Sequence, residues 1–131
     1  MVTSQDIKKY INAELGDSRL YAKLAEIAPN EEYRILLMDF SEDEKRHADK
    51  LTEMFQKMTG KGYSPNTAEP IIVNSFFETL RKRMLDESYD YGKYMSAARN
   101  ADDENMKLQF EAFADDENIH AHRLMYMISG Y

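Results

Sequence analysis

Two stretches of this sequence decide its fold: FSEDEKRHADKLTEM at residues 40–54 and FADDENIHAHRLMYM at residues 113–127. Each places Phe, Asp-Glu, His, Leu and Met at the same relative positions, and an offset of 73 residues superposes one stretch on the other. The same offset pairs further residues: Glu14 with Glu87, Tyr21 with Tyr94 and Ala25 with Ala98. We therefore interpret the chain as an internal duplication, in which a site made by one half is repeated by the other.

Helix-breaking and helix-capping residues divide the chain into four predicted helices, over about residues 4–28, 31–59, 75–100 and 102–129. Pro29 separates the first two helices, and residues 61–73 form the one long connection. An extended connection of this length could span about 43 Å at ~3.3 Å per residue, which is enough to cross a helical bundle. We therefore predict one all-α domain over residues 1–131, a four-helix bundle with a long crossover between the second and third helices and approximate internal two-fold symmetry.

The overall composition limits the possible functions. The 131 residues carry a formal net charge of -7, which repels phosphate backbones, so we expect no nucleic-acid partner. The chain has no cysteine, which excludes thiolate metal sites, disulfides and iron–sulfur clusters. No apolar run is long enough for a secretory leader or a membrane span, so we expect no membrane association and a cytoplasmic location. The basic run Arg81-Lys82-Arg83 is interpreted as a solvated helix face.

Each predicted helix has an inward-facing stripe of residues that are spaced three and four apart. The stripes are apolar except near their centres, where they contain four glutamates and two histidines: Glu14, Glu44, His47, Glu87, Glu117 and His120. The stripe of the third helix consists of Phe77, Leu80, Met84, Glu87, Tyr91, Tyr94 and Ala98. No lysine or arginine lies on the predicted stripes, so we expect no side chain of the protein to neutralise these glutamates.

Buried carboxylates of this kind require a source of positive charge, because burying an isolated one costs several kcal/mol. In each Glu-x-x-His motif the two side chains lie about 60° apart on the helix, so that they can share one metal ion. Two divalent ions balance four carboxylates, and oxygen-rich ligation with two imidazoles favours iron or manganese over structural zinc. The sequence therefore predicts a site for two metal ions, for which iron is our first assignment and manganese is the alternative.

These motifs resemble the rubrerythrin branch of the ferritin-like diiron family over almost the whole chain. The resemblance rests on Glu14, Glu87 and the two segments Asp43-Glu44-Lys45-Arg46-His47 and Asp116-Glu117-Asn118-Ile119-His120. It implies that Glu14 and Glu87 are terminal carboxylate ligands, Glu44 and Glu117 bridging ligands, and His47 and His120 the nitrogen ligands. It also implies that Tyr21 and Tyr94, seven residues after the terminal glutamates, hydrogen-bond near the site and are candidate catalytic residues.

Four aspartates are candidate ligands or neighbours of ligands. Asp43 and Asp116 are similar to groups in related diiron oxidases that accept a hydrogen bond from the histidine of the opposite half. Asp90 occupies the position of a further glutamate ligand of rubrerythrins, although its side chain is shorter. Asp17 repeats Asp90 at the same offset from its glutamate, and both a surface position and a position beside the ligands remain open for it.

The resemblance implies an oxidoreductase that binds two Fe(II) ions and reduces hydrogen peroxide or, less efficiently, dioxygen. The four cysteines of a rubredoxin-like domain are absent, so we expect electrons from a separate donor, either a rubredoxin-like protein or another reductant. The expected assembly is a homodimer or a similarly small homo-oligomer.

Three other functions remain open at this point. One is a ferroxidase that stores iron in a hollow shell of many subunits. The second is a metal-free helical interaction module in which the polar residues only specify pairing. The third is an activity like that of manganese catalase, which ligand type alone does not exclude.

Overall fold

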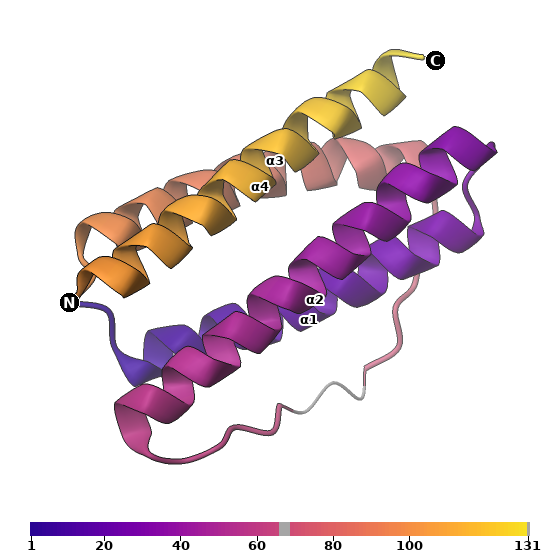
Figure 1. Ribbon diagram of the computed structural model, residues 1–131. Coiled ribbons are helices and arrows are strands. Elements are labelled where there is room, and N and C mark those ends of the chain that lie inside the picture. The colour runs from indigo at the N-terminus through magenta and orange to yellow at the C-terminus, as the bar shows by residue number, and fades with distance from the viewer. Residues whose placement is uncertain (66–68, 131) are drawn as a thin grey trace. The chain divides into compact units, whose positions relative to one another are not determined.

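The computed structural model describes residues 1–65 and 69–130, and the regular elements in these ranges are helices (Figure 1). They are α1 (Ser4–Glu26), α2 (Glu31–Thr59), α3 (Phe76–Arg99) and α4 (Glu104–Ser129). Two compact units divide the chain, one over Val2–Ile72 and the other from Val73 onward. Within each unit two helices lie side by side as a hairpin, α1 with α2 and α3 with α4. The helix ends lie within two residues of the predicted ones, while the single-domain assignment stays a prediction.

Each helix begins at a polar residue whose side chain accepts a backbone hydrogen bond from the first turn: Thr3, Asn30, Ser75 and Asp103. Such caps satisfy N–H groups that have no partner inside the helix. At the start of α1 the bonds are reciprocal, and the backbone N–H of Thr3 holds the pKa of the Asp6 carboxyl below its usual value. Asp103 takes the capping position itself, so α4 begins at Glu104 rather than at the predicted residue 102.

The helix ends follow from proline and glycine. α1 ends at Glu26, two residues earlier than predicted, because a residue that precedes a proline avoids helical geometry and Ala28 precedes Pro29. α2 ends at Thr59 and is followed by its C-cap Gly60, whose φ of 74° lies in the left-handed region and whose N–H donates to the carbonyl of Gln56 at 2.8 Å. Glycine alone adopts this backbone conformation without a steric cost.

Replacing Gly60 with alanine is therefore expected to lower the free energy of unfolding by roughly 1 kcal/mol, because a Cβ strains the left-handed conformation. Urea denaturation followed by circular dichroism measures this change. Gly62→Ala is the matched control, since Gly62 lies outside the positive-φ region and an added Cβ meets no atom within 4 Å. Equal destabilisation by the two substitutions would contradict the assignment of the cap.

The predicted inward stripes of α1, α2 and α4 are buried at every position; they run at spacings of three and four from Ile7 to Ala25, from Tyr33 to Met54 and from Met106 to Met127. The predicted stripe of α3 is wrong at three of its positions. Met84 and Phe77 are half-buried, and Tyr91 is 37% exposed. The buried face of α3 is rotated instead toward Arg83 and Ala97. Four of the seven predicted positions of α3 are nevertheless buried: Leu80, Glu87, Tyr94 and Ala98. Helical periodicity therefore located three faces correctly and the fourth in part.

A difference between the two hairpins explains the exposure of Tyr91. At the equivalent position in the first hairpin, Ser18 lies between α1 and α2 and exchanges hydrogen bonds with Ser41. Each serine hydroxyl donates to the other's carbonyl, at 2.8 Å from Ser18 and 2.7 Å from Ser41. Such direct contact requires small side chains. Tyr91 is too large for this arrangement, and its ring lies toward the surface.

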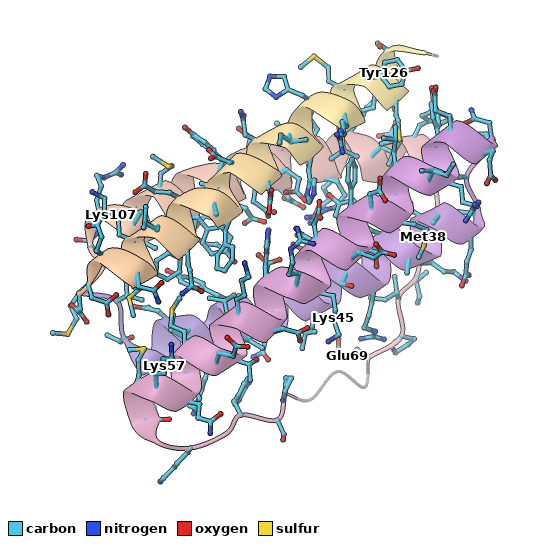
Figure 2. The ribbon with its side chains drawn as sticks, viewed as in Figure 1. Met38, Lys45, Lys57, Glu69, Lys107 and Tyr126 are labelled. Carbon is cyan, nitrogen blue, oxygen red and sulfur yellow. The ribbon has the colours of Figure 1, made fainter. Side chains whose placement is uncertain are left out.

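The described parts of the long connection are held against α1 within the first unit. The Arg19 guanidinium donates to the carbonyl oxygen of Glu69 at 2.6 Å, and Figure 2 labels Glu69 on this segment. The Tyr63 hydroxyl donates to the side chain of Asn12 at 2.9 Å. None of the helices in the described ranges is both long and apolar enough to cross a membrane.

Candidate metal centre

The first hairpin contains a buried cluster of two carboxylates and one imidazole. Glu14 comes from α1, and Glu44 and His47 come from α2 at a spacing of three residues, which puts them on one side of the helix. His47 Nδ1 lies 3.4 Å from Glu14 Oε2 and 3.6 Å from Glu44 Oε1. Each residue offers one ligand atom, and these atoms lie within 4.8 Å of one another. All three side chains are at most 2% exposed.

The second hairpin repeats this cluster. Glu87 comes from α3, and Glu117 and His120 come from α4. His120 Nδ1 lies 3.6 Å from Glu87 Oε2 and 3.6 Å from Glu117 Oε1, and the three side chains have no exposed surface. The ligand atoms that they offer also lie within 4.8 Å of one another. The duplication seen in the sequence thus extends to the geometry of each cluster.

The position of the four glutamates within their helices excludes the usual backbone sources of stabilisation. Each lies near the midpoint of a helix of 23 to 29 residues. The unpaired N–H groups and the positive end of the helix dipole are confined to the first turn, so they do not reach these carboxylates. A burial cost of several kcal/mol per ion must therefore be offset by another positive group.

Hydrogen bonds do not account for the full capacity of these side chains. Within the described ranges, the buried side-chain atoms that lack a hydrogen bond all belong to the six cluster residues, which nevertheless interact through the ion pairs given above. The atoms are Glu14 Oε2, both oxygens of Glu44 and of Glu117, Glu87 Oε2, His47 Nδ1 and His120 Nδ1. Oxygen and imidazole nitrogen atoms gathered in this way fit a transition-metal ion.

Arg83 contradicts the expectation that no lysine or arginine lies on an inward face. It is 6% exposed, and its guanidinium donates to Glu87 Oε1 at 3.1 Å and to Asp86 Oδ2 at 3.1 Å. The interpretation of the basic run as solvated holds for Arg81 and Lys82, which are exposed, and is wrong for Arg83. The sequence contained one signal for this contact: a basic residue four positions before a glutamate lies next to it on a helix.

The four candidate aspartates are less buried than the cluster residues. Asp43 accepts a hydrogen bond from the Arg46 guanidinium at 2.8 Å. Asp90 forms an ion pair with Lys93 at 3.5 Å, and the Lys93 ammonium lies 4.5 Å from the centre of the Tyr94 ring. Asp17 and Asp116 are half-buried. Their proposed roles beside the metal remain predictions.

Tyr21 and Tyr94 are fully buried within equivalent aromatic contacts. The Tyr21 ring packs edge-on against Phe40 at a centroid distance of 5.3 Å, and the Tyr94 ring packs in the same manner against Phe113 at 5.4 Å. Phe110 adds a stacked contact to Tyr94 at 6.0 Å. These contacts hold both rings rigidly, which is the requirement for a hydroxyl group that has to be positioned near a reaction centre.

The charge of the ligands in each cluster can be compared with that of one divalent ion. Two carboxylates and a neutral imidazole carry a charge of -2, which a single M²⁺ balances, and in the second cluster Arg83 adds one positive charge beside Glu87. The ligand set of two carboxylates and one imidazole suits iron or manganese. The donor set therefore fits the metal that the sequence predicted.

Arg83→Gln is expected to lower the free energy of unfolding of the metal-free protein by about 3 kcal/mol, because it leaves the buried Glu87 carboxylate without this cation. Urea denaturation in the presence of a chelator measures the change. Arg81→Gln is the matched control on the same helix. It removes the same charge from an exposed pair with Glu78, so a loss within about 0.5 kcal/mol is expected. Losses of the same size for the two variants would show that the Arg83 ion pair does not stabilise the fold.

Comparisons with known proteins agree with this structure. A sequence model of the rubrerythrin family matches residues 7–79. The uncharacterized protein YhjR of Bacillus subtilis (strain 168) is 30% identical over 127 residues, which cover 97% of this chain and 87% of that protein. The structure of a hypothetical protein from Pyrococcus furiosus matches 94% of this chain and 85% of its own, with a TM-score of 0.84 and 21% identity. The predicted fold class, an all-α ferritin-like fold of four helices, is confirmed.

Proposed function

Because the chain belongs to the rubrerythrin family, we propose that it is a dinuclear metal oxidoreductase that reduces hydrogen peroxide or, less efficiently, dioxygen. The observation that supports this most strongly is the pair of buried Glu-Glu-His clusters, one in each hairpin. The proposed ligands are Glu14, Glu44 and His47 in the first hairpin and Glu87, Glu117 and His120 in the second.

Iron is the metal that we propose, with manganese as the alternative. When bound, the two Fe(II) ions would supply both the electrons and the Lewis acidity for reduction of peroxide. Reduction of one peroxide to two waters consumes two electrons and two protons. A separate electron donor would return the protein to its reduced state, because the residues of the two clusters are not themselves reductants.

The side chains of the chain have three tasks in this proposal. The glutamates bind the ions and balance their charge inside an apolar interior, where water competes poorly for the same positions. The histidines complete each set of ligands with a nitrogen donor. Tyr21 and Tyr94, which are buried and fixed by neighbouring phenylalanines, are proposed to hold a proton near the reacting oxygen atoms.

Metal binding is expected to raise the free energy of unfolding of the protein, because the ions offset the charge of the buried glutamates. A divalent ion at about 1,000 times its dissociation constant adds ~4 kcal/mol per site, so the melting temperature should rise with Fe(II) or Mn(II) and fall with a chelator. Elemental analysis of the loaded protein should give two metal ions per chain. A metal-free interaction module would bind less than one ion and melt at the same temperature with or without chelator.

Glu44→Gln should change the stability in opposite directions in the two states. The metal-free variant should be more stable than the wild type by roughly 1 kcal/mol or more, because a buried charge is removed. Its melting temperature should respond much less to metal, because a ligand has been lost. Glu42→Gln, an exposed substitution on the same helix, should alter neither property. A full response to metal in the Glu44 variant would exclude this residue as a ligand.

The choice of oxidant can be tested by rapid mixing under anaerobic conditions. Protein loaded with Fe(II) is expected to oxidise faster with hydrogen peroxide than with air-saturated buffer, as followed by absorbance in a stopped-flow instrument. A faster reaction with air would contradict the peroxidase assignment. Light scattering on the same sample separates a small assembly from the hollow shell of many subunits that an iron-storage ferroxidase requires.

A further inference from the structure

The two clusters differ at the position that lies four residues before the first glutamate of each. In the second hairpin, Arg83 lies four residues before Glu87 and forms an ion pair with it at 3.1 Å, and the side-chain exposures are 7% and 0%. The duplication offset of 73 residues places Tyr10 at the equivalent position before Glu14 in the first hairpin. A permanent positive charge therefore accompanies one of the two clusters, while the other has a neutral phenol at that position.

Arg83 occupies one of the two oxygens that Glu87 can offer to a metal. Its guanidinium donates to Oε1, whereas Oε2 lies 3.6 Å from His120 Nδ1, on the side of the cluster. A carboxylate that shares an oxygen with a guanidinium is a weaker donor toward a second cation. Arg83 is also held from its other side by Asp86 Oδ2 at 3.1 Å, so this arrangement is fixed by two carboxylates.

We propose that Arg83 makes the α3–α4 cluster the weaker of the two metal sites, so that the chain takes up its two ions in a fixed order. The first ion binds at Glu14, Glu44 and His47, and the second at Glu87, Glu117 and His120. This inference rests on the proposed metal-binding function and adds an order of loading to it. At limiting metal concentration the protein then holds one ion, in the α1–α2 hairpin.

The sign of the effect follows from charge. Arg83 places a permanent positive charge 3.1 Å from Glu87 Oε1, and a divalent ion held by the same carboxylate would lie within a few ångströms of it. The two cations repel one another at that distance. The net effect of Arg83 is therefore to weaken metal binding at its own cluster. In the poorly screened interior, we expect a difference of about tenfold or more between the two sites.

Anaerobic titration with Mn(II) alone tests the order of loading, with free Mn(II) followed by its electron paramagnetic resonance signal. The wild type should bind two ions with dissociation constants that differ by about tenfold or more. Arg83→Gln should tighten the weaker step by about tenfold or more and leave the tighter step within about threefold of the wild type. Arg81→Gln, which removes an exposed charge from the same helix, should leave both constants unchanged.

Three further variants assign each step and guard against a folding defect in Arg83→Gln. Arg83→Lys keeps the charge and should retain two unequal steps, and circular dichroism verifies that it folds. In the native Arg83 background, His120→Ala should keep the tight step and lose the weak one. His47→Ala should show the reverse, because it disables the α1–α2 cluster.

The possible outcomes separate this inference from the proposed function. Failure of the wild-type protein to bind Mn(II) would overturn both. Two ions bound with equal affinity, or a weaker step that Arg83→Gln leaves unchanged, would overturn the order of loading and leave the dinuclear site intact. Retention of the tight step in His47→Ala and its loss in His120→Ala would show that the order is the opposite of the proposed one.

Discussion

The structure depends on the cost of keeping ionised carboxylates in an apolar interior at the middle of long helices. The four glutamates at these positions are beyond the reach of helix ends and of water, so each needs a positive group within a few ångströms. A divalent metal ion meets this need for two carboxylates at once, whereas a protein cation meets it for one. The gathering of each Glu-Glu-His cluster at one place in its hairpin follows from this requirement.

The sequence alone predicted the helices and most of their buried faces, because both depend on local signals. Capping residues such as Asn30 and Asp103 and breakers such as Pro29 and Gly60 determine where each helix begins and ends. The spacing of apolar residues then fixes the direction of the core. The two Glu-x-x-His motifs, together with the glutamates at the centres of the other two stripes, are the six residues that the structure places in buried clusters, and their binding of a metal stays a proposal.

The buried face of α3 was predicted only in part, because it depends on how individual side chains pack. Arg83 and Met84 are neighbours in the sequence, and helical periodicity does not decide which of them turns inward. Arginine can be buried because its methylene groups are apolar, provided that its guanidinium finds a carboxylate, and Glu87 provides one. The position of Tyr91 depended likewise on the size of its ring compared with the Ser18 hydroxyl at the equivalent position.

The presence of both hairpins in one chain has a genetic consequence. In an assembly of identical hairpins encoded by one gene, every substitution appears in all copies, so an arginine beside one cluster is accompanied by an arginine beside the other. Here each hairpin has its own codons, and one position carries Arg83 while its equivalent carries Tyr10. The presence of two separate repeats thus allows mutation to adjust one half of the chain without altering the other.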